Sequence, residues 1–281
     1  MFKIIEKKQL NENTFTMSVY APLVCRNIKP GQFVIIMTDE DSERIPLTIS
    51  SFDPENGTVT VVFQAIGAST IKLSHKNAGD SIAHFTGPLG EATHLDGIKN
   101  ACVIGGGVGC AIALPEAKWL FEHGANVDIV AGFRSKDIVI LEEEMKNACD
   151  SLTVCTDDGS YGVKGFVTQV LSDNIQSGKK YDCVIAIGPI PMMKAVSDIT
   201  KKEDINTIVS LNPIMIDGTG MCGCCRVTVD GETKFACVDG PDFDGRKVDF
   251  NELMSRNAMY KQQEQEAKDH ICRLFGGSEN V

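Results

Sequence analysis

Several features that would narrow the function of a protein are missing from this sequence. No apolar run reaches the ~18 residues of a membrane-spanning helix, and the first residues lack the charged, apolar and small-residue order of a secretion signal. Basic residues are scarce, with 27 Lys and Arg against 38 Asp and Glu, which gives a formal net charge of −11. This charge would repel nucleic-acid phosphates and offers no basic patch to a membrane surface. We therefore expect a cytoplasmic protein that binds neither nucleic acid nor membranes.

Cysteine, in contrast, is abundant. The 281 residues include 11 cysteines, an odd number, and several of them (Cys102, Cys110 and Cys183) stand in runs that have the pattern of buried strands and helices. This distribution argues against a disulfide framework and for a reducing compartment. The length of the chain suits two domains and a small appendage.

The cysteines are densest between residues 217 and 237, in DGTGMCGCCRVTVDGETKFAC. Cys222, Cys225 and Cys237 occupy the last three positions of a plant-type [2Fe–2S] pattern, in which Cys-x4-Cys-x2-Cys is followed by a distant cysteine. Asp217 stands at the first position. The glycines of this segment allow the backbone to fold tightly and to turn N–H groups toward the sulfides of a cluster. The segment therefore predicts an iron–sulfur site.

Zinc is the main alternative at this segment, because Cys222, Cys224, Cys225 and Cys237 could form a four-cysteine site. The side chains of adjacent Cys224 and Cys225 point in different directions, so only one of them is expected to reach a metal. Cys225 is better placed, since it has the two-residue spacing from Cys222 that is typical of metal knuckles. Asp217 could be an ordinary turn residue, with Cys224 or water completing the set. We favour the iron–sulfur interpretation.

Residues 1–97 have the pattern of a small antiparallel β-barrel. Short β-branched runs are separated by turn sequences such as KPG at 29–31 and PENG at 54–57, and a closed or nearly closed barrel is expected. The predicted strands are 2–5, 14–20, 33–37, 47–51 and 58–63. Ser69 and Thr70 follow Gly67 at a helix start, where free N–H groups and hydroxyls could hold a pyrophosphate, and Arg44 could supply a matching cation. Taken singly, such residues are more often helix caps or a surface arginine.

In combination these residues resemble the flavin domain of the ferredoxin–NADP reductase superfamily. In that domain an Arg-x-(Pro/Tyr)-x-(Ser/Thr) segment and a Gly-x-x-(Ser/Thr) helix start hold the flavin and its phosphates, and GPLG at 87–90 resembles the exit from the barrel. The resemblance implies that Thr48 lies near flavin N5, the atom that exchanges hydride. The FAD-binding residues that it implies are Arg44, Pro46, Leu47, Thr48, Ile49, Phe63, Gln64, Ala65, Gly67, Ser69 and Thr70.

Residues 98–212 alternate between strand and helix patterns. A buried strand at 101–104 precedes GGGVG at 105–109, a helix at 111–123 and a second strand at 126–131. Further strands are predicted at 151–156, 181–187 and 207–211, so we expect a doubly wound α/β domain with a parallel sheet. The glycine turn departs from GxGxxG, because Cys110 stands at the third glycine position, and Pro115 comes later than in related turns. Alone, the turn is a weak dinucleotide motif.

The GGGVG run resembles the nicotinamide domain of the same superfamily. The NAD(H)-binding residues that this resemblance implies are Gly105, Gly107, Gly109, Asp158, Gly159, Gly188 and Pro189. Asp157 and Asp158 would repel a 2′-phosphate if they face the adenosine ribose, which favours NAD(H) over NADP(H). Arg134 and Lys136 could instead serve a 2′-phosphate.

The CVDGP sequence that begins at Cys237 resembles the electron-transfer subunits of dihydroorotate dehydrogenase and their relatives. Those subunits use four cysteines, whereas this chain has Asp217 at the first ligand position. With this aspartate the chain most resembles the small subunits of electron-bifurcating NADH-dependent ferredoxin:NADP oxidoreductases, which are also known as sulfide dehydrogenase subunits. The resemblance implies Asp217, Cys222, Cys225 and Cys237 as metal ligands. It also implies a heterodimer with a larger flavin and iron–sulfur subunit, through which ferredoxin is reached indirectly.

The expected fold is therefore a β-barrel FAD domain (1–97), an α/β NAD domain with a doubly wound parallel sheet (98–212), a small [2Fe–2S] segment (213–246), and a C-terminal helix and tail (247–281) without order after Phe275. The expected function is electron transfer between NAD(H), FAD and the cluster. This exchange needs no general acid or base, so no catalytic residue is assigned. The alternatives are an electron-transfer subunit of a dihydroorotate or sulfide dehydrogenase, a stand-alone ferredoxin-NAD(P) reductase, and a redox sensor without catalytic activity.

Overall fold

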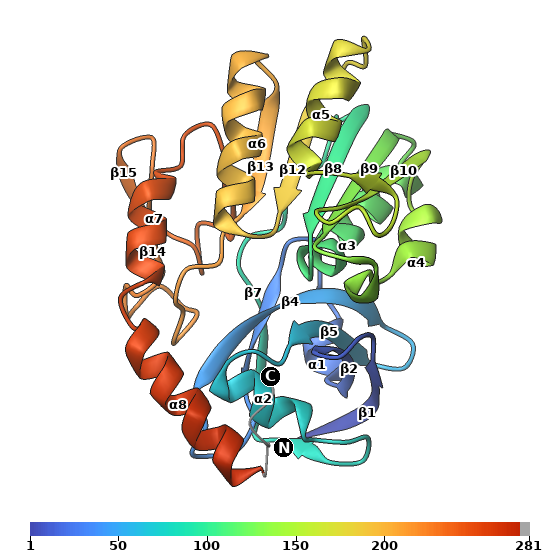
Figure 1. Ribbon diagram of the computed structural model, residues 1–281. Helices are drawn as coiled ribbons and strands as arrows, with labels where there is room; N and C mark the ends of the chain where they lie inside the picture. Colours follow the sequence, from blue (N-terminus) through green and yellow to red (C-terminus); the bar gives the residue numbers. More distant parts are fainter. Residues whose placement is uncertain (276–281) are drawn as a thin grey trace.

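The computed structural model describes residues 1–275, and its first part is an antiparallel sheet of seven strands (Figure 1). The strands lie in the order β6-β1-β2-β5-β4-β3-β7. Their bounds are β1 (Phe2–Gln9), β2 (Thr14–Tyr20), β3 (Phe33–Met37), β4 (Arg44–Asp53), β5 (Thr58–Gln64), β6 (Ser81–Ile82) and β7 (His84–Leu89), with two short helices, α1 (Pro22–Cys25) and α2 (Ala68–Ser74).

This sheet is a nearly closed barrel. Its two edge strands, β6 and β7, are consecutive in sequence and separated only by Ala83, so the chain itself joins one edge of the sheet to the other. Alternate side chains fill the interior, because successive residues of a strand point to opposite faces. In β5, for example, Val59, Val61 and Phe63 are all at most 2% exposed. The predicted barrel is confirmed.

The second sheet also has seven strands, in the order β11-β10-β9-β8-β12-β13-β16. All neighbours are parallel except β13 and β16, which are antiparallel. The strands are β8 (Asn100–Gly106), β9 (Asn126–Phe133), β10 (Ser151–Thr156), β11 (Val163–Lys164), β12 (Cys183–Ile187), β13 (Asn206–Ser210) and β16 (Asp242–Asp244). The helices are α3 (Gly109–Glu122), α4 (Glu142–Lys146), α5 (Val167–Gln176) and α6 (Ile190–Lys202), with a 3-10 turn η1 (Lys136–Ile138).

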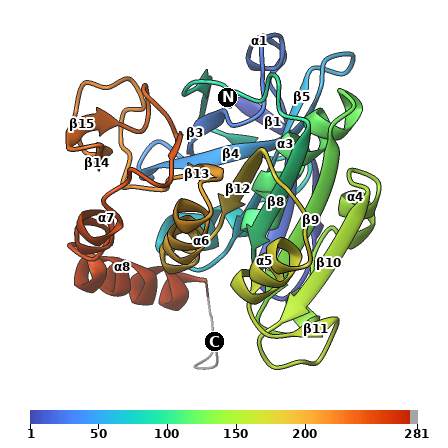
Figure 2. The same ribbon diagram turned by 90° about the horizontal axis from the view of Figure 1, so that it is seen from above.

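Helices cover both faces of this sheet, as predicted for a doubly wound domain (Figure 2). On one face Val103 of β8 belongs to the same buried cluster as Ala111 of α3 and Met145 of α4. On the other, Ile104 belongs to a cluster with Val170 of α5 and Met193 of α6. Neighbouring residues of β8 thus serve opposite cores, which explains why this strand reads as an unbroken apolar run.

The C-terminal part adds a hairpin of β14 (Arg226–Val229) and β15 (Glu232–Phe235), and the helices α7 (Phe250–Asn257) and α8 (Lys261–Leu274). After the hairpin the chain returns to the second sheet, where β16 pairs with β13 through Val209 and Phe243. Helix α8 then crosses to the barrel and lies beside α2 (Figure 1), where His75 stacks on Phe275 at 4.1 Å between ring centroids.

The fold class predicted from the sequence is confirmed. The domain boundaries at 97, 212 and 246 stay a prediction, as does the lack of order after Phe275, which concerns residues outside those described. Within residues 1–275, no helix has both the length and the apolar character that crossing a membrane requires.

Candidate cofactor and cluster sites

Strand β4 carries the residues predicted to hold the flavin. Arg44 begins the strand and is exposed, whereas Pro46, Leu47 and Thr48 are half-buried along it. Beyond them, the Ser50 hydroxyl donates a hydrogen bond of 3.1 Å to the carbonyl oxygen of Ala111 in α3. The predicted flavin strand therefore touches the helix that follows the glycine turn of the second sheet.

The start of α2 presents backbone N–H groups, but its hydroxyls have local partners. Thr70 Oγ1 accepts the N–H groups of Ile66 at 3.2 Å and Gly67 at 3.1 Å, so it caps its own helix. The Ser69 hydroxyl donates to a carboxylate oxygen of Glu43. A Cβ on Gly67 would meet only Thr70 Oγ1, at 4.0 Å, so this helix end is open to a ligand. The site fits an FAD pyrophosphate chiefly through N–H groups and Arg44.

The remaining residues predicted for FAD lie at the end of β5. Phe63 is 2% exposed and stacks on Phe15 with ring centroids 5.8 Å apart, so its side chain faces the barrel interior. Gln64 is half-buried, and the Ala65 N–H donates to the carbonyl oxygen of Asn13 at 2.8 Å. These residues therefore shape the strand end that leads to α2.

The glycine turns after β8 and β12 meet at the carboxyl ends of their strands. A Cβ on Gly109 would overlap the carbonyl oxygen of Ile187, and one on Gly106 would lie 2.9 Å from Pro189 Cδ. Gly107 has φ of +58° and open space around its Cα. The two turns are close because glycine leaves no side chain between them, and the open backbone at Gly107 suits close approach of a dinucleotide.

The loops after β9 and β10 hold the charged residues that bear on nucleotide choice. The Asp158 N–H donates to the carbonyl oxygen of Arg134 at 3.3 Å, which joins the two loops. Hydrogen bonds from the Ser160 hydroxyl and N–H hold the pKa of Asp158 below its usual range. Asp157, Asp158 and Arg134 are all exposed, so an anionic and a cationic group lie at the same edge of the sheet.

The cluster segment brings two of its predicted ligands together in the interior. Cys225 and Cys237 are 1% and 2% exposed, with their sulfur atoms 3.2 Å apart. The Gly220 N–H donates to Cys237 Sγ at 3.2 Å. Burial raises the pKa of Cys237 to about 12, so a metal charge is needed to hold it as thiolate.

Asp217, which is half-buried, and Cys222, which is exposed, form the outer side of the same loop. The Asp217 carboxylate accepts the N–H of Thr219 at 2.7 Å and the N–H of Cys222 at 2.6 Å. These bonds, with that from Thr219 the stronger influence, lower the pKa of Asp217 and keep it anionic. The intervening glycines 218 and 220 have φ of +77° and +82°, which side-chain-bearing residues rarely adopt.

These residues fit an iron–sulfur cluster. Two buried sulfurs, an N–H aimed at one of them and an anionic carboxylate line one loop, and Cys225 rather than Cys224 meets Cys237. Within residues 1–275, no three His, Cys, Asp or Glu side chains converge as a cage for a single ion. The segment thus has the ligand chemistry predicted for a cluster, with Asp217 and Cys222 on its solvent side.

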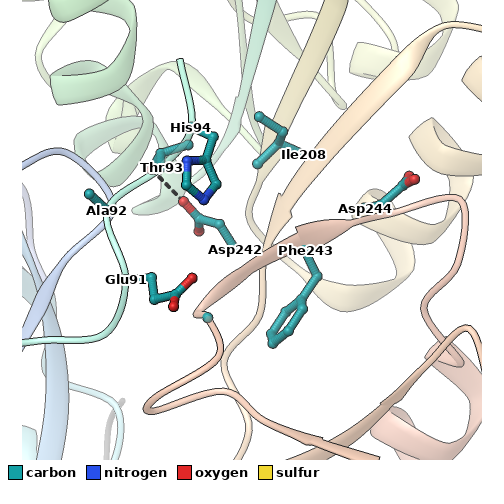
Figure 3. Close-up of a pocket in the computed structure, with 9 residues that line it drawn as sticks. Glu91, Ala92, Thr93, His94, Ile208, Asp242, Phe243 and Asp244 are labelled. Carbon is teal, nitrogen blue, oxygen red and sulfur yellow. Dashed lines mark hydrogen bonds between the residues drawn. The ribbon is translucent and has the colours of Figure 1, made fainter. Parts of the chain in front are cut away.

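A polar cluster around the buried Glu116 escaped the sequence analysis. Thr93 Oγ1 lies within hydrogen-bond distance of both Glu116 and Asp242 where the barrel exit, α3 and β16 meet, and Figure 3 shows its contact with Asp242. The signal that could have found it is the spacing on α3. Glu116 is three residues after Ala113 and four before Leu120, both buried, so the helical period places a carboxyl on the buried face.

A barrel joined to a doubly wound sheet, with glycine turns at its strand ends and a cysteine loop beside it, defines a reductase of the ferredoxin-reductase type that carries its own iron–sulfur segment. Residues 212–249 match the family model described as the iron-sulfur cluster binding domain of dihydroorotate dehydrogenase B. The chain belongs to the family of dihydroorotate dehydrogenase B electron-transfer subunits and their homologues.

Individual relatives span nearly the whole chain. The electron transfer subunit homolog of Thermotoga maritima is 44% identical over 99% of this chain and 98% of its own length. The dihydroorotate dehydrogenase B (NAD(+)) electron transfer subunit of Geobacillus thermodenitrificans is 34% identical over 87% of this chain and 96% of its own length. A solved structure of the NADH-dependent reduced ferredoxin-NADP oxidoreductase, from work on flavin-based electron bifurcation, superimposes with a TM-score of 0.92 at 41% identity, covering 96% of this chain and 97% of that one. The predicted resemblance is confirmed.

Proposed function

We propose that this chain converts between the paired electrons of NAD(H) and the single electrons of an iron–sulfur cluster, and exchanges the single electrons with a larger subunit. The chain is an oxidoreductase subunit for electron transfer, and its cofactors are FAD, NAD(H) and a [2Fe–2S] cluster. The observation that carries the proposal is the convergence of three parts. Strand β4 contacts α3 through Ser50, the two glycine turns meet, and the cluster segment joins the second sheet through β16.

A bound flavin supplies the chemistry that joins two-electron and one-electron transfer. The residues of the chain bind and orient the cofactors and stabilise charge on them. We propose that Arg44 and the N–H groups at the start of α2 hold the pyrophosphate, and that the open backbone at Gly107 receives the dinucleotide. The Gly220 N–H directed at Cys237 Sγ would stabilise negative charge on that sulfur, because a donor favours the more anionic state of its acceptor.

The partner of these family members is a larger catalytic subunit. We propose more specifically a heterodimer with a larger flavin and iron–sulfur subunit that reaches ferredoxin. Exposed apolar side chains near the cluster loop support docking of another protein there, since Ile216, Met221 and Val238 are 48%, 88% and 39% exposed. We also propose a cytoplasmic location, supported by eleven free cysteines within the described residues.

Purification of the chain with its native partner tests this proposal. A larger subunit that carries flavin and iron–sulfur clusters is expected, together with NADH oxidation that requires both reduced ferredoxin as a second electron donor and NADP⁺ as the acceptor. The second candidate function is electron transfer for dihydroorotate oxidation, which the family match over residues 212–249 favours. Recovery of a dihydroorotate-oxidising subunit as the sole partner would replace the first candidate by the second.

Replacing Asp217 by cysteine is expected to retain the cluster and to change its absorption and electron paramagnetic resonance spectra, because thiolate is a softer iron ligand than carboxylate. Asp230→Asn is the matched control, since Asp230 lies on the β14–β15 turn and pairs with Lys247 at 3.1 Å. That variant should leave the spectra unchanged. Identical spectra for Asp217→Cys and the parent chain would remove Asp217 from the ligand set.

NADH is expected to reduce the flavin faster than NADPH does, because Asp157 and Asp158 would repel a 2′-phosphate. The measurement is stopped-flow bleaching of the flavin under anaerobic conditions. The double substitution Asp157→Asn and Asp158→Asn should raise the rate with NADPH severalfold relative to the rate with NADH. Equal or faster reduction of the parent chain by NADPH, lost in Arg134→Ala, would reverse the assignment.

A further inference from the structure

Three polar side chains meet where the parts of the molecule join, and we call them the junction triad: Thr93, Glu116 and Asp242. Glu116 is buried, Thr93 and Asp242 are half-buried, and Figure 3 shows the contact between the last two. Thr93 follows the barrel, Glu116 lies on α3, and Asp242 begins β16. Thr93 Oγ1 is 3.0 Å from Glu116 Oε1 and forms a short hydrogen bond with Asp242 Oδ2. A Cβ on Gly31 of the barrel turn would overlap Thr93 Oγ1 and lie 2.7 Å from Asp242 Oδ2.

The number of protons in the triad follows from its geometry. A threonine hydroxyl has one proton to donate, and an ionised carboxylate can only accept. Thr93 Oγ1 can therefore satisfy one of its two carboxyl neighbours, and the other contact requires a carboxyl that donates to the hydroxyl. With both carboxyls ionised, one of the two contacts would set oxygen against oxygen with no proton between them.

The surroundings also oppose two ionised carboxylates. Glu116 is fully buried, and its Oε2 and Asp242 Oδ1 are buried oxygens without a hydrogen-bond partner among the described residues. Burial, and then the charge of Asp242, raise the pKa of Glu116 well above its usual range. Burial likewise raises the pKa of Asp242. Within residues 1–275, neither carboxyl forms an ion pair with a cation.

We propose that the junction triad is a one-proton binding site, in which Glu116 and Asp242 share a proton through Thr93 and thereby hold the barrel exit, α3 and β16 together. Loss of this proton would leave two negative charges, that of Glu116 fully buried, on one hydroxyl. Separation of β16 from α3 would relieve that repulsion. Because β16 begins five residues after Cys237, the proton couples the packing of the cluster segment to pH.

Charged and titratable groups lie around the triad on several elements. Glu91, His94 and Asp244 line the adjoining cavity of about 140 Å³. Glu116 also raises the pKa of Cys183 on β12, although burial is the larger cause. Lys29, on the barrel turn, is exposed. His94 is the histidine in this cavity lining, so it is a control position for the experiment below.

The sign of the pH effect is fixed by the raised pKa. A carboxyl that holds its proton more tightly in the folded state loses that proton on unfolding, so its contribution to stability is highest at low pH. It falls as the pH rises from the ordinary carboxyl pKa through the folded pKa. One such proton makes the unfolding equilibrium constant rise about tenfold per pH unit. Hydrogen bonds lower the pKa values of Asp158, Asp182 and Asp217, so these carboxyls change the stability only at pH values below that range.

The experiment measures denaturant unfolding of the cofactor-loaded chain between about pH 5 and 8, where ordinary carboxyls are already ionised. Glu116→Gln and Asp242→Asn each preserve the shape of the side chain and remove the need for the shared proton. Each should therefore abolish the rise of the unfolding equilibrium constant, about tenfold per pH unit, that the triad causes in the parent chain. Their combination should flatten the pH dependence no further. The controls are His94→Gln and Glu203→Gln, the latter at an exposed site. Their unfolding equilibrium constants should depend on pH as steeply as that of the parent chain.

Infrared difference spectroscopy provides a second readout, whose decisive result comes from the parent chain alone. The parent chain at pH 7 should show the carbonyl band of one buried protonated carboxyl, and Glu116→Gln or Asp242→Asn should abolish it. Absence of that band from the parent chain would overturn the proposal. So would a metal ion bound stoichiometrically by the parent chain and lost from Glu116→Gln, because a cation would then occupy the place of the proton.

Discussion

Cys237→Ser is expected to lose the iron–sulfur cluster while keeping its FAD. Cys237 is 2% exposed, its sulfur lies 3.2 Å from that of Cys225 and it receives the Gly220 N–H, so a serine would place a poor iron ligand at an enclosed position of the loop. Iron and sulfide should fall from about two atoms each per chain to near none. Anaerobic NADH should still bleach the flavin, and electron delivery to a one-electron acceptor should drop to background.

Two other cysteine variants make this result specific. Cys272→Ser, on α8, should retain the cluster, because this half-buried residue lies outside the loop. Cys224→Ser should also retain it, since Cys225 is the neighbour that meets Cys237. Loss of the cluster from Cys224→Ser together with its retention in Cys225→Ser would exchange the two assignments. Zinc in place of iron in the parent chain would contradict the whole ligand argument.

Gly109→Ala is expected to abolish reduction of the flavin by NADH and to destabilise the fold by roughly 1–3 kcal/mol, the usual cost of overpacking. A Cβ at this position would overlap the carbonyl oxygen of Ile187 and lie 2.8 Å from its carbonyl carbon. Both atoms belong to the backbone of β12, so relief requires the two glycine turns to move apart. The measurements are stopped-flow flavin reduction and urea unfolding, with dithionite reduction to show that the flavin remains bound.

Gly124→Ala is the matched control at the other end of the same helix. Gly124 has φ of +83°, and a Cβ added there would have no other atom within 4 Å, so alanine costs only the left-handed backbone conformation, about 1 kcal/mol. NADH should reduce the flavin of this variant at the parent rate. Normal hydride transfer in Gly109→Ala would mean that contact between the two turns is not needed for nicotinamide binding.

The architecture could be predicted from the sequence because its signals are local. Alternating β-branched runs indicated the barrel, and the buried run at 101–104 followed by glycines indicated the first βα turn. The ends of the strands could not be predicted as well from these local signals. β4 begins at Arg44 rather than at 47, and β16 appears only because Asp242–Asp244 finds an open edge at β13. A three-residue strand of Asp, Phe and Asp has no periodicity to detect.

Side-chain directions in the candidate sites could not be predicted in the same way. Phe63 faces the barrel core, and Thr70 uses its hydroxyl to cap its own helix, although both residues stand in the positions that the resemblance implies for FAD. The cause is tertiary context, since a residue on a strand or a helix start can serve either side. The junction triad depends wholly on contacts between distant segments, and only the acid on the apolar face of α3 signals it.

The central claim is that one chain joins hydride chemistry to single-electron transfer. Anaerobic mixing of the purified chain with NADH, followed by optical and electron paramagnetic resonance spectra of the same sample, tests it most directly. The flavin should bleach first, and the signal of a reduced [2Fe–2S] cluster should then appear in proportion to the chain present. A chain that contains neither iron nor flavin, or a flavin that NADH reduces without any electron reaching a cluster, would contradict the account.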